Sequence, residues 1–204
     1  VRYQDYSKQI DDEKRIFLQS RSIDCVIDVG ANIGQFGLEL RRLGYSGRII
    51  SFEPLSEAYS KLCLIAENDP AWDVINCALG EKNMEAAIHV SNNSLSSSLL
   101  QMTDRHTKVA PNSRYIREEP ISIRTLDSEF SKVSSDDRNI FLKIDTQGYE
   151  HNVIAGAAAV MENVQILQVE MSICTLYSGS MLFDDLYEII HNMGFRLHTL
   201  HPVM

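Results

Sequence analysis

Three acidic side chains follow apolar runs, at points where a β-strand would carry them to one edge of a sheet. Glu53 and Asp145 stand directly after such a run, and Glu170 lies at the end of one. Carboxylates at a shared edge can accept the hydroxyl hydrogens of a sugar, remove a proton from a reacting group, or bind a hard cation. The chemistry of this chain is therefore expected where its strands end.

A glycine-bearing turn at 28–34 (Asp-Val-Gly-Ala-Asn-Ile-Gly) joins the first apolar run to a helical pattern. Glycine in such a turn lets the backbone approach a ligand closely. The spacing is Gly-x-x-x-Gly, which differs from the dinucleotide pattern Gly-x-Gly-x-x-Gly, and a phosphate-loop Lys-Ser/Thr is missing. Glu53 follows Asp28 by 25 positions, where an acidic residue can bind ribose hydroxyls. Turn and acid together predict a nucleoside site.

The elements that position these residues alternate along the chain. Apolar runs predict strands at 25–29, 48–52, 74–79, 86–90, 140–144, 166–171 and 195–200. Apolar residues at helical spacing predict helices after the first, second, fifth and sixth of these runs. This order predicts an α/β fold: a doubly wound, mostly parallel, Rossmann-like sheet with helices on both faces. Its ligand is expected outside the carboxyl ends of the strands.

The domain organisation is simple. Residues 1–22 are predicted to be an N-terminal helical or extended segment, and 23–204 a single domain with an insertion at about 91–120. Within the insertion, 92–101 is serine-rich and the rest is polar. A long irregular segment of this kind is either a functional lid or disordered.

Composition limits the class of protein. The net charge of −9 and the short basic clusters disfavour nucleic acid as a partner. No apolar run is long enough to span a membrane, and the first residues do not form a secretory signal. Four cysteines without a Cys-x-x-Cys pair favour a reducing, cytoplasmic location.

Three motifs together resemble the FkbM family of class I methyltransferases. They are the turn at 28–34, the strand end Phe52-Glu53-Pro54, and the segment 143–150 (Lys-Ile-Asp-Thr-Gln-Gly-Tyr-Glu). The resemblance covers about residues 24–200. It implies a Rossmann-like methyltransferase sheet, S-adenosylmethionine as cofactor, and methylation of an oxygen, often a sugar hydroxyl of a glycolipid, polysaccharide or natural product.

The resemblance also implies roles for the residues that match its motifs. The cofactor's methionine part would contact Asp28, Gly30 and Asn32, and its ribose would contact Glu53. The end of the third strand would flank the adenine, through Ala78 and Leu79 beside Cys77. These last residues are equally well interpreted as buried strand residues.

Candidate catalytic residues are Asp145, Glu170 and His151. Asp145 would line the cofactor site and either remove the acceptor's proton or orient its hydroxyl; alternatively it caps the following helix. Glu170 is expected beside Asp145, where two acids could share acid–base work or hold a cation. No histidine has ligand spacing to either acid, so no metal site is predicted. Glu150 is expected to stabilise a helix start, with Lys143 as its ion-pair partner.

The sequence thus predicts an S-adenosylmethionine-dependent O-methyltransferase acting on a sugar or polyhydroxyl acceptor, a small molecule or glycan. Two alternatives remain open: an NAD-dependent oxidoreductase of Rossmann type, and a non-catalytic nucleoside-binding domain. A homodimer is an additional expectation. With 86–90 taken as an extra strand, 195–200 is the sixth strand of the main sheet. Class I methyltransferases usually add an antiparallel seventh strand beside the sixth, and only four residues follow 195–200. We therefore expect an incomplete sheet edge there, either bare or covered by another molecule, or a native chain that continues.

Overall fold

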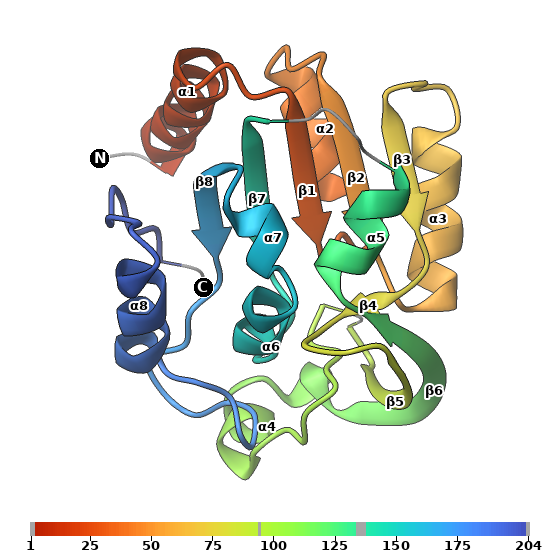
Figure 1. The fold of residues 1–204 in the computed structure, drawn as a ribbon. Coiled ribbons are helices and arrows are strands. Elements are labelled where there is room, and N and C mark those ends of the chain that lie inside the picture. Colours follow the sequence, from red (N-terminus) through yellow and green to blue (C-terminus); the bar gives the residue numbers. More distant parts are fainter. Residues whose placement is uncertain (1–2, 94, 134–137, 203–204) are drawn as a thin grey trace.

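A computed structural model describes residues 3–93, 95–133 and 138–202 of the chain. Its central feature is a five-stranded sheet in the order β3-β2-β1-β7-β8, in which neighbouring strands run parallel (Figure 1). The strands of this main sheet are β1 (Cys25–Val29), β2 (Arg48–Phe52), β3 (Trp72–Ile75), β7 (Ile140–Ile144) and β8 (Val164–Val169).

Helices cover both faces of the main sheet. One face packs against α1 (Tyr3–Ser20), α2 (Gln35–Arg42) and α3 (Ser56–Ala66). The other packs against α5 (Leu126–Val133), α6 (Glu150–Ala155), α7 (Ala158–Met161) and α8 (Phe183–Asn192). Along β1, Ile27 and Val29 pack on the face covered by α5 to α8, whereas Val26 packs on the face covered by α1 to α3, since side chains alternate across a strand. Burial on both faces explains the continuous apolar runs, and the predicted doubly wound α/β fold is confirmed.

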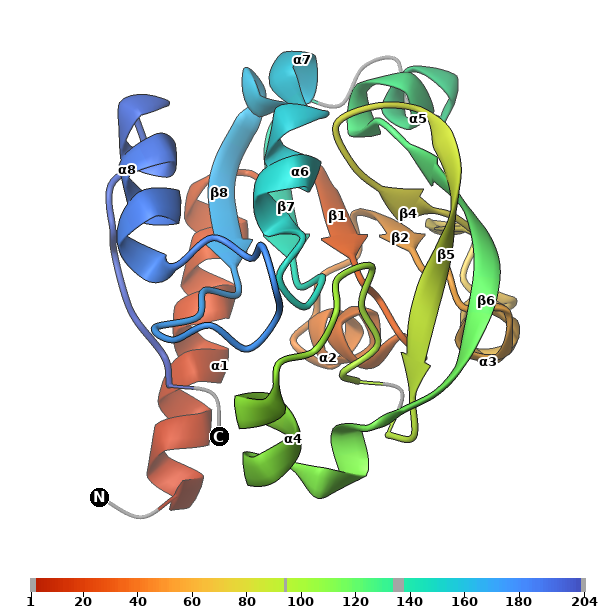
Figure 2. The same cartoon turned by 90° about the horizontal axis from the view of Figure 1, so that it is seen from below.

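A second sheet of three strands lies beyond the carboxyl ends of the main sheet (Figure 1). Its order is β4-β6-β5, with β4 (Ala78–Leu79), β5 (Met84–Ser91) and β6 (Tyr115–Arg124). A short helix α4 (Asp104–Val109) and a 3₁₀ turn η1 (Pro111–Ser113) connect β5 to β6. Figure 2 shows β5 and β6 curving together along one side of this end.

Two predictions about this region are wrong. The predicted third strand at 74–79 is two strands in different sheets, because the Asn76 side chain donates to the carbonyl oxygens of Glu53 and Pro54 (2.9 and 3.0 Å) and the chain leaves the main sheet there. The supposedly irregular 91–120 contains α4, η1 and the first part of β6. Pro120 is tolerated in β6 because its only partner at that position is Ala87 of β5.

The prediction of a sixth strand at 195–200 is also wrong. The structure places no strand there; the segment packs against α1 instead, with the His198 ring edge-on to Phe17 at 4.7 Å and His201 Nε2 3.5 Å from Glu13 Oε2 (Figure 2). Among the described residues, β8 is therefore the last strand of the main sheet on this side. The edge of the main sheet that we expected at 195–200 is therefore formed by β8 instead.

No helix within the described ranges is both long and apolar enough to cross a bilayer.

Candidate functional site

The turn after β1 lies in direct contact with the carboxyl ends of β2 and β7. Gly30 has φ +75°, and a Cβ there would lie 1.9 Å from the carbonyl oxygen of Asp145. The amides of Gly30 and Ala31 both donate to the carbonyl oxygen of Phe52, at 3.1 and 3.0 Å. Only glycine allows this approach, so Gly30 holds the carboxyl ends of β1, β2 and β7 together.

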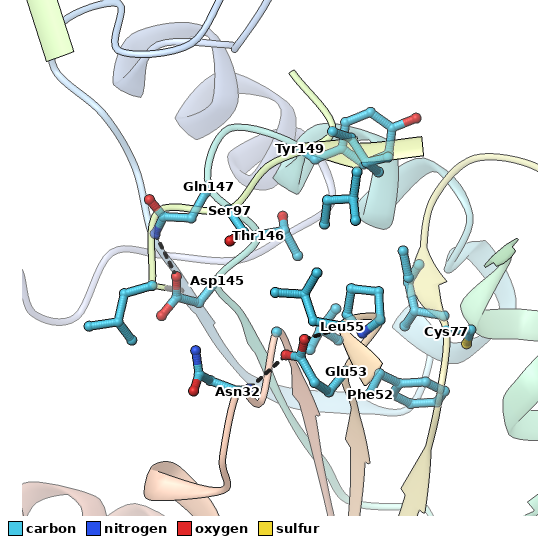
Figure 3. Close-up of a pocket in the computed structure, with 18 of the residues that line it drawn as sticks. Asn32, Phe52, Glu53, Leu55, Cys77, Ser97, Asp145, Thr146, Gln147 and Tyr149 are labelled. Carbon is cyan, nitrogen blue, oxygen red and sulfur yellow. Dashed lines mark hydrogen bonds between the residues drawn. The ribbon is translucent and has the colours of Figure 1, made fainter. Parts of the chain in front are cut away.

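A pocket lies at the carboxyl ends of these strands. Glu53 lines it directly after β2, with 5% of its surface exposed. Its Oε2 accepts from the Asn32 amide (2.8 Å) and its Oε1 from the Leu55 amide (2.9 Å), as Figure 3 shows. Burial raises the pKa of Glu53 to about 7, although these two backbone donors oppose the shift. A carboxylate oxygen keeps a second lone pair after one such bond, so both oxygens can still accept ligand hydroxyls.

Asp28 does not line this pocket. Its side chain is fully buried, and Lys143 Nζ lies 3.0 Å from its Oδ1. The same ammonium donates to the carbonyl oxygen of Gly30 (3.2 Å) and lies 3.5 Å from Asp145 Oδ2. Asp28 therefore acts on the turn through Lys143, and a direct contact with a ligand's methionine part stays a prediction.

The proposed partner of Glu150 is corrected by this arrangement. Lys143 pairs with Asp28 and Asp145, whereas Glu150 Oε1 accepts from the amides of Thr146 and Gly148, both at 3.0 Å. Glu150 is buried in the first turn of α6 and closes the loop that precedes it. Its role is structural, as an acid at a helix start predicts.

Asp145 and Glu170 come together because β7 and β8 are neighbours. The Nε2 of Gln147 donates to Asp145 Oδ1 at 3.1 Å and to Glu170 Oε2 at 2.6 Å. Burial, and then repulsion from Asp145, raise the pKa of Glu170 to about 8. Asp145 does not cap α6, whose N-cap residue is Tyr149. The structure thus brings both predicted acids to one pocket and adds Gln147, which sequence reasoning missed.

The pocket combines acids with an apolar wall. Carboxylates of Glu53, Asp145 and Glu170 line it, and its described lining contains no lysine or arginine. Its apolar and small residues come from the ends of β2 and β4 and from the insertion, and they include Leu55, Ala78, Leu79, Leu95, Ser97 and Leu99. Ala78 and Leu79 are buried strand residues that also line the pocket, and their contact with an adenine stays a prediction. The contribution of the insertion was not predicted residue by residue.

His151 does not line the pocket. It is on α6, and its ring centroid lies 6.4 Å from that of Tyr149. Burial lowers the pKa of His151, and the charge of Glu81 opposes this shift. Its catalytic role stays a prediction. Among the described residues no group of three or more potential metal ligands occurs.

The parallel sheet, the turn after β1 and the acid after β2 define a Rossmann-like α/β enzyme of the methyltransferase type. The model of the methyltransferase FkbM domain matches residues 28–197. The chain therefore belongs to the FkbM methyltransferase family, as its three motifs predict. No protein with a curated description matches the chain.

Proposed function

We propose that this methyltransferase uses S-adenosylmethionine and transfers its methyl group to a hydroxyl oxygen of a sugar or polyhydroxyl acceptor. The observation that carries the cofactor assignment is the composition of the pocket lining: three acidic side chains beside apolar residues and, among the described residues, no lysine or arginine. Such a lining suits a ligand with ribose hydroxyls and a cationic sulfonium. When bound, the cofactor would supply an electrophilic methyl group.

The residues of the pocket divide the binding work by chemistry. Glu53 would accept ribose hydroxyl hydrogens, since its oxygens stand at the end of β2 with lone pairs to spare. Gly30 and Asn32 would hold the methionine part with backbone and amide groups. The apolar surface of Ala78 and Leu79 would lie against the adenine.

Asp145 and Glu170 divide the catalytic work. The ammonium of Lys143 lies 3.5 Å from Asp145 Oδ2, whereas burial favours the protonated form of Glu170. Asp145 would accept the proton of the acceptor hydroxyl, and Glu170 would share that proton through the hydrogen bond between the two carboxyl groups, which Gln147 holds side by side. The acceptor would enter past Leu95 and Ser97 of the insertion, which line the same pocket.

The alternative functions predict different ligands. An NAD-dependent enzyme must hold a diphosphate, and the acidic lining would repel it. A non-catalytic domain has no use for a pair of acids beside the nucleoside site. The four cysteines are free thiols, which supports the proposed cytoplasmic location. A homodimer and the exclusion of nucleic acid stay predictions.

Calorimetric titration with S-adenosylhomocysteine and with NADH tests the cofactor assignment. We expect saturable binding of the first and none of the second; the reverse result would contradict the proposal. Transfer of labelled methyl from S-adenosylmethionine to a panel of free sugars, glycosides and their deoxy analogues tests the acceptor class. Loss of labelling on removal of a single hydroxyl would identify the oxygen that is methylated.

A further inference from the structure

Gln147 lies between the two acids, and the binding and catalytic roles above do not account for how its side chain is held. Its Nε2 donates to Asp145 Oδ1 at 3.1 Å and to Glu170 Oε2 at 2.6 Å, and Figure 3 shows the first of these bonds. A primary amide has two N–H groups, so one side chain can make both bonds at once. Gln147 therefore bridges two carboxyl groups that belong to different strand ends.

The other end of the amide fixes its orientation. Oε1 of Gln147 accepts from the Tyr177 hydroxyl at 2.9 Å. Rotated by half a turn, the amide would point its oxygen at Asp145 and Glu170, and its N–H groups at the tyrosine. Repulsion between oxygen acceptors disfavours that arrangement, so the hydroxyl and the two acids select the same orientation.

Tyr177 connects this amide to the insertion. Its ring is 2% exposed and lies edge-on to His106 of α4, with centroids 5.1 Å apart. Its hydroxyl also lies 3.3 Å from the carbonyl oxygen of Ser96, and its backbone forms a β-bridge with Met102. Tyr177 thus contacts three separate positions of the segment that covers the pocket. It packs behind the pocket and does not line it.

The backbone at Gln147 is held from both sides. Gln147 has φ +57°, a conformation that few non-glycine residues adopt, and its carbonyl oxygen accepts from the Ser98 hydroxyl at 2.7 Å. At the next residue, Gly148, a Cβ would lie 3.0 Å from Ser180 Cβ and 3.2 Å from Tyr177 Cβ. Unusual backbone geometry kept by surrounding contacts is typical of functional sites.

We propose that Gln147 is a positioning residue that holds Asp145 and Glu170 as one hydrogen-bonded pair, and that Tyr177 sets its amide according to the position of the insertion. The inference rests on the proposed function, since it concerns the same two acids. It adds that the segment over the pocket controls how this pair shares its proton.

The charged groups around the pair determine the direction of the effect. Lys143 of β7 faces it with a positive charge, Glu150 of α6 with a negative one, and Tyr177 with a neutral hydroxyl whose pKa burial raises. The amide N–H groups of Gln147 stabilise the ionised carboxyls. Their removal should therefore raise the pKa of the pair.

Carbon-13 NMR titration of the carboxyl groups in the free, full-length protein tests the proposal without cofactor or acceptor. Gln147→Met keeps the length of the side chain and removes both donors. We expect the apparent pKa values of the Asp145–Glu170 pair to rise by about one unit or more. Tyr177→Phe keeps the ring and removes only the hydroxyl, and should produce a smaller shift in the same direction. Gln165→Met, at an exposed position of β8, is the matched control and should leave the pair unchanged.

A pair that titrates identically in wild type and in Gln147→Met would overturn the proposal. An equal shift in Gln165→Met would overturn it too, because the effect would then be general. Should Gln147→Met not fold, an unshifted pair in Tyr177→Phe would refute the coupling to the insertion. Failure of the proposed function has a different signature: absence of S-adenosylhomocysteine binding by the wild type, whatever the titration shows.

Discussion

With Glu53 as the proposed ribose ligand, its raised pKa should make cofactor binding depend on pH. In the free protein this pKa is about 7, since burial disfavours the charged carboxyl. Ribose hydroxyls donate to a carboxylate, so the bound state requires the ionised form. At a pKa of about 7 roughly one molecule in 11 is ionised at pH 6 and roughly 10 in 11 at pH 8. The affinity for S-adenosylhomocysteine should therefore be about tenfold weaker at pH 6 than at pH 8, a difference of about 1.4 kcal/mol in the free energy of binding.

Calorimetry at pH 6, 7 and 8, in buffers of different ionisation enthalpy, measures this effect in two ways. The dissociation constant should fall as pH rises, and binding at pH 7 should release about half a proton. Glu170 also titrates in this window, with a pKa of about 8. Glu53→Gln separates the two, because it should weaken binding and abolish the part of the pH dependence that Glu53 causes. An affinity that does not change from pH 6 to pH 8, or a pH dependence that is undiminished in Glu53→Gln, would refute the reasoning.

The same pKa affects the stability of the free protein in a defined direction. The folded state holds the Glu53 proton more tightly than the unfolded chain, whose value is near 4.5. The contribution of this proton to the free energy of unfolding is therefore fully present below about pH 4.5 and is lost as the pH rises through about 7. Bound cofactor should oppose this loss, so the ligand-induced rise in melting temperature should be larger at pH 8 than at pH 6.

Three further predictions concern catalysis, the turn and the insertion. Asp145→Asn should leave affinity for S-adenosylhomocysteine near normal and lower turnover by roughly 100-fold or more, and normal turnover would remove Asp145 from the catalytic role. Gly30→Ala places a Cβ 1.9 Å from a carbonyl oxygen, whereas Gly44, whose φ of +87° is also positive, has nothing within 4 Å of an added Cβ. Chemical denaturation should show that the first costs about 2 kcal/mol or more beyond the second, and equal costs would contradict the close approach. Amide exchange in 92–101 should slow when cofactor and acceptor bind, and equal protection in both states would make this segment a fixed wall.

Local sequence pattern was sufficient to predict the turn after β1 and the acid after β2. The turn at 28–34 and Glu53 are each defined by a few adjacent residues, and the strand that precedes each can be recognised from its apolar run. The parallel sheet then brings their carboxyl ends together without further information. For this reason the family, the fold and the position of the pocket could all be predicted from sequence.

Sequence pattern failed to predict strands correctly where the polarity of a segment and its actual strand pairing disagreed. The first half of β6 carries exposed charges and Pro120, so it does not alternate as a strand should, yet β5 supplies its hydrogen bonds. Residues 195–198 alternate apolar and polar side chains, but the segment lies against α1, where Phe17 contacts the His198 ring and Glu13 contacts the following His201. Pairing between distant segments decides such cases, and one segment's composition does not encode it.

The partners of the buried charged groups were decided by tertiary structure alone. Lys143 could pair with any nearby acid, and only the register of β1 against β7 places it on Asp28. Gln147 reaches Glu170, 23 positions away, because β8 lies beside β7 and because Tyr177 turns the amide toward it. Sequence determines which groups stand at strand ends, whereas side-chain orientation and strand neighbours decide which of them touch, since a hydrogen bond requires both its distance and its direction.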